Sequence, residues 1–161
     1  MYIFGGKQSI FENSNKLYRF NFDEPLWEQL EYDEKDGYAP SCVDSHNAIL
    51  FHTPEGDEII IFGGFMGGKI GKYSRSIYGY CIQSNKWRMI YDGFSEKKVD
   101  LGTKKNIPKK RGSAGMTLFD GNLYIFGGAN SKVKFDDLWK FNLSNKQWTL
   151  IETIGNKPLV T

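Results

Sequence analysis

The chain has 161 residues, of which 40% are hydrophobic and 25% charged, and a formal net charge of +2. These proportions are typical of one soluble globular domain, and so small a net charge gives no strong field to favour nucleic acid. No run approaches the roughly 18 apolar residues of a membrane span. The N-terminus also lacks the basic and apolar stretches of a secretion signal, so we expect a cytoplasmic protein without membrane contact.

The first predicted unit covers residues 1–32 and opens with a strand that ends in Ile3-Phe4-Gly5-Gly6. An alternating strand around Tyr18 follows, and Trp27 lies nine residues further on, within a third strand. Because Met1 already stands at the start of the glycine-ending strand, this unit is expected to have three strands.

The second unit covers residues 40–92 and has an additional strand at its start, over residues 46–51. A turn leads to a strand that ends in Ile61-Phe62-Gly63-Gly64, and an alternating strand with Tyr78 comes next. Period-2 alternation of aromatic and smaller residues indicates a strand with one buried face. A fourth strand carries Trp87, again nine residues after Tyr78.

The third unit covers residues 108–153 and repeats all four strands. Its first strand is predicted over residues 114–119, and its second ends in Ile125-Phe126-Gly127-Gly128. Trp139 lies on the third strand and Trp148 on the fourth, with the same spacing of nine.

The three copies recur with steps of 58 and 64 residues between their second glycines, a period typical of stacked four-stranded units of a propeller. Paired glycines allow a strand to end sharply beside a neighbouring backbone. Use of the glycines as a phosphate cradle is disfavoured because no helix N-terminus follows them. Large tryptophans fill the space between sheets. Structural roles are therefore expected for Gly5, Gly6, Gly63, Gly64, Gly127, Gly128, Trp27, Trp87 and Trp148.

The order of these features resembles the kelch repeat, which has an Arg and a His near strand one, an apolar strand ending in Gly-Gly, a Tyr-x-Tyr-like strand and a Trp. Arg111 occupies the Arg position of the third unit, where the second unit has Val43. The His position holds His46 in the second unit and Ala114 in the third. The resemblance implies a structural role for Arg111 and for His46, with the imidazole bonded inside its own blade.

The predicted fold is thus all-β: a segment of a kelch-type β-propeller with two complete four-stranded blades and one three-stranded partial blade. Residues 154–161 would approach a further blade. Kelch-like propellers contain four to eight blades in a closed ring, so this incomplete ring would leave two apolar blade faces bare. Exposure of two apolar faces to water would be unfavourable for the free energy of the folded chain. The expectation is a fragment, an incomplete product, or a chain completed by further blades from the same or another chain.

The connections from strand two to three, and from strand four to the next strand one, are predicted to share one rim of the propeller. Long loops on a rigid scaffold commonly carry function. From Lys97 to Arg111 the local charge is 7 − 1 = +6. These residues are either solvated loop charges or a surface for an acidic or phosphorylated segment of a protein partner. The candidate basic contacts are Lys69, Lys72, Arg75, Lys104, Lys105, Lys109, Lys110, Lys132 and Lys134.

Four larger side chains interrupt the glycine-rich connection of the second unit, namely Phe65, Met66, Ile70 and Tyr73. One interpretation is that they fold back onto the rim as a plug. The other is that Phe65, Met66 and Tyr73 contact the partner, since Met and aromatic residues are common at adaptable interfaces. Nucleic acid is disfavoured as a partner, because the remaining aromatics belong to strands and do not alternate with the basic residues.

An enzyme is the competing class. Some kelch-like propellers resemble copper radical oxidases, others resemble sugar mutarotases, and some recognition domains are attached to phosphatases. The only two histidines, His46 and His52, are not placed to converge on copper, and Cys42 and Cys81 do not form a zinc pattern. No nucleophile motif is found. We therefore predict no catalytic residue, no metal and no cofactor.

Overall fold

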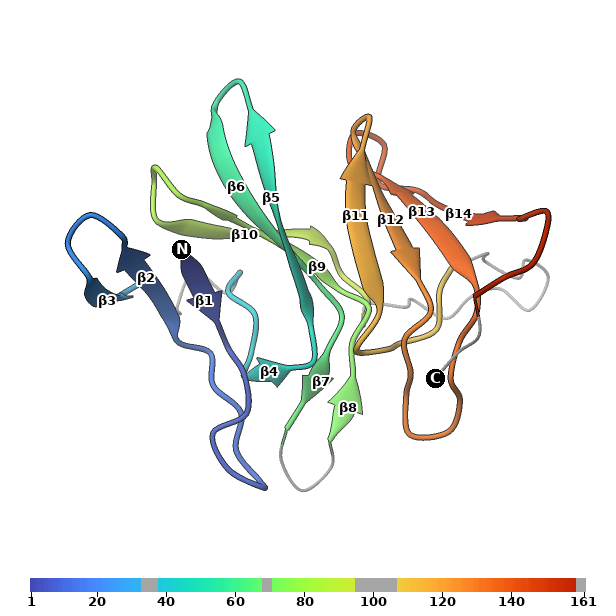
Figure 1. Cartoon of the computed structure of the whole chain (residues 1–161), viewed down its shortest axis with the longest axis horizontal. Helices are drawn as coiled ribbons and strands as arrows, with labels where there is room; N and C mark the ends of the chain where they lie inside the picture. The colour runs from blue at the N-terminus through green and yellow to red at the C-terminus, as the bar shows by residue number, and fades with distance from the viewer. Residues whose placement is uncertain (33–37, 68–70, 95–106, 159–161) are drawn as a thin grey trace.

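The structure is a computed structural model that describes residues 1–32, 38–67, 71–94 and 107–158, and the described residues form strands and turns without a helix. Three twisted antiparallel sheets stand side by side (Figure 1) and follow one another along the chain. We call them the first, second and third sheets. The predicted all-β fold is confirmed, and the described residues do not form a closed ring.

The second sheet has four strands: β5 (Asn47–Thr53), β6 (Gly56–Phe62), β9 (Ile77–Cys81) and β10 (Lys86–Tyr91). They pair in the order β10-β9-β6-β5. Apolar side chains lie on both faces of this sheet, because it has a neighbouring sheet on each side.

The third sheet repeats this arrangement with β11 (Gly115–Phe119), β12 (Asn122–Phe126), β13 (Leu138–Asn142) and β14 (Trp148–Ile151). They pair in chain order. Asp120 and Gly121 join β11 to β12, with φ of 48° and 68°. Positive φ at both central residues is the requirement of the type I′ turn, one of the two-residue hairpin turns whose twist matches that of the strands.

The first sheet has three strands: β1 (Tyr2–Phe4), β2 (Leu17–Asn21) and β3 (Leu26–Leu30). Its order is β1-β2-β3, so β1 is an edge strand. In the other two sheets, an additional strand covers the edge that β1 leaves open. The three-stranded partial unit expected from the sequence is therefore present.

Two apolar cores lie between the sheets. One joins the second and third sheets around Phe62, Leu123 and Phe141. The other joins the first and second sheets around Phe4 and Tyr80. Each sheet is therefore stabilised by packing on its neighbour, as in a propeller.

The tryptophans of the fourth strands pack toward the preceding sheet. The ring of Trp87 lies 4.9 Å from that of Phe4, and the ring of Trp148 lies 5.9 Å from that of Phe62. Trp27 has no described sheet before it, and 48% of its surface is exposed. The tryptophan at this position of the repeat is thus packed against the preceding sheet where one is described, and it is largely exposed where none is.

The paired glycines join consecutive sheets through the backbone. Gly63 and Gly64 have φ of 70° and 93°, which L side chains rarely adopt. The Gly64 amide donates to Arg111 O at 2.9 Å, and the Arg111 amide donates to Ser74 O at 2.9 Å. A Cβ on Gly63 would lie 2.7 Å from Arg111 O. The glycines therefore permit the close backbone approach that holds the next sheet in place.

Candidate protein-interaction rim

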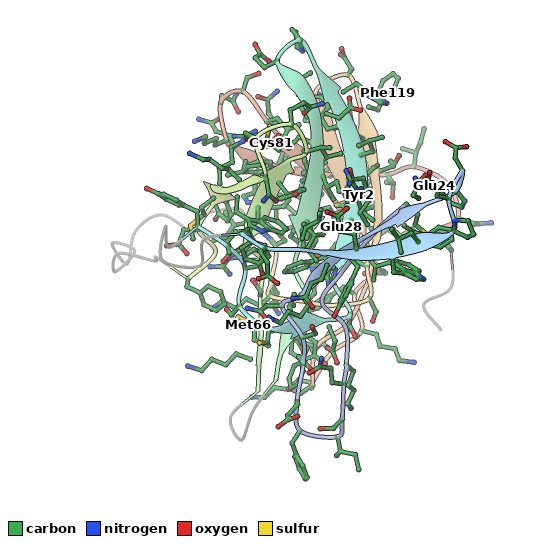
Figure 2. The ribbon with its side chains drawn as sticks, turned by 90° about the vertical axis from the view of Figure 1, so that its left-hand side faces the viewer. Tyr2, Glu24, Glu28, Met66, Cys81 and Phe119 are labelled. Carbon is green, nitrogen blue, oxygen red and sulfur yellow. The ribbon has the colours of Figure 1, made fainter. Side chains whose placement is uncertain are left out.

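The connections between the second and third strands of all three sheets extend toward the lower end of the molecule in Figure 1. In the side view of Figure 2, Met66 lies near this lower end and Phe119 lies at the opposite end. The segment that leads from Pro108 to Arg111 reaches the same end, because Arg111 is bonded to the Gly64 turn. We call this end, with its connections, the lower rim.

A small sheet on the lower rim was not expected from the sequence. It pairs β4 (Val43–Asp44) with β7 (Phe65–Met66), and β7 with β8 (Lys72–Tyr73). The Phe65 and Tyr73 rings lie 5.1 Å apart. Asn13 Nδ2, from the first sheet's connection, donates to Phe65 O at 2.8 Å.

This small sheet decides how the apolar residues of the connection are placed. Phe65, Met66 and Tyr73 are half-buried. They fold back onto the rim, in agreement with the first of the two interpretations of this connection. Part of each side chain is still exposed. Contact of these side chains with a partner stays a prediction. Ile70 lies outside the described residues.

Basic side chains from two connections come together beside this sheet. Lys110 Nζ lies 4.1 Å from the centre of the Phe94 ring. Burial, followed by the nearby charges of Arg75 and Lys72, lowers the pKa of Lys110, and Asp92 opposes this effect. Because neighbouring cations disfavour the charged form of Lys110, the approach of an anion would stabilise that form.

Arg75 lies beneath this surface, with only 7% of its area exposed. Its Nη1 donates to Pro108 O at 3.3 Å. A Cβ on Gly93 would lie 2.6 Å from Arg75 Cγ, so the glycine makes room for the arginine. Arg75 thus contributes positive charge and holds the segment before Arg111, while exposed Lys72 and half-buried Lys110 offer the accessible ammonium groups.

The other candidate lysines that the structure describes flank this group. Lys109, Lys132 and Lys134 are exposed. Asn130 connects their two segments, since its Nδ2 donates to Lys110 O at 3.3 Å and its Oδ1 accepts from the Lys132 amide at 2.9 Å. The predicted contacts Lys69, Lys104 and Lys105 lie outside the described residues.

Arg111 anchors the third sheet's part of the rim. It is fully buried and forms a two-pronged ion pair with Asp137. Its guanidinium lies 4.0 Å from the centre of the Phe135 ring, and Trp139 Nε1 donates to Asp137 Oδ2 at 2.7 Å. Burial alone would raise the pKa of Asp137, but the hydrogen bonds from Arg111 and Trp139 outweigh it and lower the pKa.

Comparison with known proteins identifies this architecture. Residues 1–160 match the KLHDC2/KLHL20/DRC7 Kelch-repeats domain. The chain belongs to the kelch-repeat family. It is 30% identical over 161 residues to Kelch domain-containing protein 3 of Rattus norvegicus, and 24% identical over 164 residues to Kelch domain-containing protein 10 of Bos taurus. These alignments cover 98% and 94% of this chain, but 39% and 33% of the two relatives.

The kelch histidine position does not behave as the resemblance implied. His46 packs edge-on against Phe4 of the first sheet, with ring centres 5.7 Å apart. Its Nδ1 is buried without a hydrogen-bond partner among the described residues. The expected bond inside its own blade is therefore not observed, and the ring instead contacts the neighbouring blade. Burial lowers the pKa of His46, and the nearby Asp44 carboxylate opposes this effect.

A pH dependence of stability follows from His46. A base whose pKa is lowered by folding contributes stability above its unfolded pKa, about 6.5 for His, and that contribution is lost as pH falls below it. Between about pH 7.5 and 5.5 the parent is therefore expected to lose more melting temperature than His46→Gln. Parallel profiles for parent and His46→Gln would contradict this.

Among residues 1–32, 38–67, 71–94 and 107–158, no group of three or more His, Cys, Asp or Glu side chains is placed to hold a metal ion. Within the same ranges, no helix has the length and apolarity needed to cross a membrane. In the described residues, the lower rim combines cations, half-buried aromatic side chains and hydrogen-bonded connections. This combination suits recognition of the surface of another molecule.

Proposed function

We propose that this kelch segment is a non-catalytic protein-interaction module whose lower rim binds an acidic or phosphorylated segment of a protein partner. The observation that carries the proposal is the contact between the connection that holds Lys72 and Arg75 and the segment that holds Lys110. Arg75 Nη1 donates to Pro108 O at 3.3 Å, and the Arg111 amide donates to Ser74 O at 2.9 Å. Kelch repeats in general form interaction modules, which agrees with this use of the fold. The specific partner and the contact residues are part of the proposal.

The chemistry of the rim favours an anionic partner over an apolar one. Lysine ammonium groups bind carboxylates and phosphates through charge-assisted hydrogen bonds. The half-buried side chains of Phe65, Met66 and Tyr73 provide adaptable apolar contact beside them. On the rim, Phe65 packs on Tyr73 with ring centres 5.1 Å apart, which argues against a base-stacking platform of a nucleic-acid site made from these two rings.

The proposal includes a cytoplasmic location. Cys42 and Cys81 are both free thiols, which accords with a reducing compartment.

The test is charge reversal at two exposed rim lysines. The double variant Lys72→Glu/Lys109→Glu should weaken binding to immobilised acidic and phosphoserine peptides at least about tenfold, because each substitution replaces attraction by repulsion. Its melting temperature should stay close to the parent's, since exposed substitutions change stability by only about 0.5 kcal/mol. Binding is measured by interferometry at low and at physiological salt.

Lys86→Glu/Lys146→Glu is the matched control. Both lysines are exposed and lie by the turns between third and fourth strands, away from the lower rim, and the pair makes the same change in net charge. This control should bind the peptides as the parent does. Equal losses in the two double variants would show that net charge alone is responsible, and unchanged binding in Lys72→Glu/Lys109→Glu would contradict the proposed site.

A further inference from the structure

The connection between β1 and β2 ends in two exposed apolar side chains. Its arms are joined by backbone hydrogen bonds, since the amides of Gln8 and Ser9 donate to Glu12 O at 2.9 and 3.2 Å. Ile10 and Phe11, between these arms, are 80% and 77% exposed. We call these two residues the apolar tip. Adjacent aliphatic and aromatic side chains at the end of an ordered hairpin are available for contact with another molecule.

Packing within the fold does not account for the apolar tip. Neither of its side chains belongs to the cores of the described residues. Where two such connections meet, the contact lies at their bases, since Asn13 Nδ2 of the first donates to Phe65 O of the second at 2.8 Å. Phe65 directly follows paired glycines, and its counterpart in the first connection is Lys7. A neighbouring connection that made the same contact would therefore reach Lys7 and not the apolar tip.

The apolar tip is continuous with the basic part of the lower rim through β7. Asn13, which follows the tip, is bonded to Phe65 of this strand, and Met66 of the same strand pairs with Lys72 of β8. A Cβ on Gly67 would lie 3.0 Å from the Asn13 side chain, so the two connections are in contact. Figure 1 shows them side by side at the lower end of the molecule. One strip of surface thus leads from the apolar tip across β7 to Lys72.

The two ends of this strip differ in chemistry. At one end, exposed Lys72 and half-buried Lys110 present ammonium groups. At the other end, the charges of Lys7 and Glu12 compensate each other beside the apolar tip. A ligand that is only acidic would leave the tip in water, and a ligand that is only apolar would not pair with the ammonium groups. The strip therefore suits a ligand that has both an anionic group and a large apolar group.

We infer, on the basis of the proposed function, that the partner segment carries a large apolar side chain close to its acidic or phosphorylated group. The apolar tip binds this side chain, and the ammonium groups of Lys72 and Lys110 bind the anion. The segment lies across β7, where Met66 provides further adaptable contact. Buried anchors contribute most of the binding energy of an interface, whereas charges at its edge mainly set the rate and specificity of association. The apolar tip therefore distinguishes the partner from other acidic segments.

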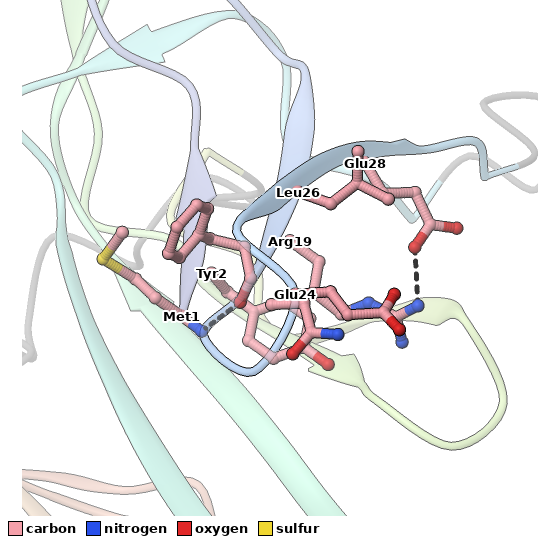
Figure 3. A pocket seen from close by; sticks show the side chains of 8 residues that line it. Met1, Tyr2, Arg19, Glu24, Leu26 and Glu28 are labelled. Carbon is pink, nitrogen blue, oxygen red and sulfur yellow. Dashed lines mark hydrogen bonds and ion pairs between the residues drawn. The ribbon is translucent and has the colours of Figure 1, made fainter.

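The first sheet also borders a hollow of about 570 Å³. Figure 3 shows that Arg19, Glu24 and Glu28 line it, with Arg19 and Glu28 paired at 2.5 Å. Because Arg19 is already paired, the carboxylates of this hollow would repel an acidic segment. The apolar tip, which is continuous with the cations of the rim, is therefore the subsite that we assign.

Capped synthetic peptides in matched pairs test the inference. Each peptide holds one phosphoserine in a glycine–serine background, and one member of each pair also has a phenylalanine, on the N-terminal or on the C-terminal side of the phosphoserine. The parent should bind one of the phenylalanine peptides at least about tenfold more tightly than its match, because a large apolar side chain becomes buried. Binding is measured by interferometry at physiological salt.

The double variant Ile10→Ser/Phe11→Ser isolates the apolar tip. It should lose the preference for phenylalanine and bind the matched peptide as the parent does. Its melting temperature should stay close to the parent's, because both side chains are exposed. Phe119→Ser is the control, since Phe119 is 70% exposed at the opposite end of the molecule, and it should keep the preference. Loss of the preference in Phe119→Ser, or its retention in Ile10→Ser/Phe11→Ser, would contradict the assigned subsite.

The same measurements separate this inference from the proposed function. If Lys72→Glu/Lys109→Glu weakens binding of all the peptides while the parent binds both members of every pair equally, the proposed function stands and the inference is wrong. If the parent binds none of the phosphoserine peptides, both are wrong. A preference for phenylalanine that requires the apolar tip supports both.

An anionic membrane is the alternative ligand, because lipid surfaces also combine negative charge with apolar chains. Vesicles of phosphatidylcholine with and without phosphatidylserine are therefore compared in a sedimentation assay. Binding to phosphatidylserine vesicles that is lost in Ile10→Ser/Phe11→Ser, together with equal affinities for the paired peptides, would overturn the assignment to a protein segment. A parent that stays in the supernatant with both kinds of vesicle, and that prefers a phenylalanine peptide, supports it.

Discussion

Replacing Arg111 by methionine is expected to lower the free energy of unfolding by about 3–5 kcal/mol, the range for removing one partner of a buried ion pair. The Arg111 side chain is fully buried and that of Asp137 is 27% exposed, so the change leaves a carboxylate with little compensation. The guanidinium also donates to the carbonyls of Lys109 and Gly127, which lose a donor. Chemical denaturation of both proteins near neutral pH measures the difference.

Arg19→Met is the matched control, since it breaks an ion pair whose two side chains are each 50% exposed. Such exposed pairs contribute little to stability because solvent screens them, so the control should cost far less than Arg111→Met. A second comparison, Arg111→Met/Asp137→Leu, should recover much of the lost stability because no unpaired charge remains. Similar costs for Arg111→Met and Arg19→Met would show that burial of the pair is not what stabilises the rim.

The comparison between parent and Arg111→Met also has a definite pH dependence. The pKa of Asp137 is lowered in the folded protein by Arg111 and Trp139, against burial. A carboxyl with a lowered pKa contributes stability above its unfolded pKa, about 3.9 for Asp, and that contribution is lost as pH falls through the folded value. The difference in unfolding free energy between the parent and Arg111→Met should therefore be largest near neutral pH and become smaller in acid.

The arrangement of sheets could be predicted from the sequence because it depends on local patterns. The Gly-Gly turns, the alternating third strands and the tryptophans recur at nearly fixed spacing, and each copy specifies one sheet. The position of a strand relative to its neighbours follows from that repeat. Within the described residues the first copy forms a sheet in the order β1-β2-β3, with β1 at its edge.

The features that the sequence did not predict depend on contacts between distant residues. Arg111 was expected to be structural, but its partner Asp137 lies 26 residues away, and no spacing rule connects them. A signal was available, since a fully buried Arg requires an acid and Asp137 directly precedes a third strand. The small sheet of β4, β7 and β8 was missed because strands of two residues have no measurable periodicity.

Replacing Trp87 by alanine is expected to cost about 3–5 kcal/mol of unfolding free energy, as for other large truncations in a core. Only 7% of Trp87 is exposed. Its ring lies 4.9 Å from Phe4 of the preceding sheet and 5.1 Å from Tyr80 of its own, so the substitution opens a cavity between two blades. Chemical denaturation again gives the measurement, and a smaller loss is expected for Trp87→Phe, which keeps an aromatic ring in the interface.

Trp27→Ala makes the same chemical change at the same position of the first copy, and it should cost only about 1 kcal/mol. Trp27 is 48% exposed, and its aromatic contact, with Phe20 at 4.8 Å, lies inside its own sheet. An aromatic pair of this kind contributes about 0.5–1.5 kcal/mol. The difference between the two alanine variants thus measures what a preceding blade adds to a kelch tryptophan. Equal costs would mean that these tryptophans stabilise their own sheets, and the account of blades held together by packing on their neighbours would be wrong.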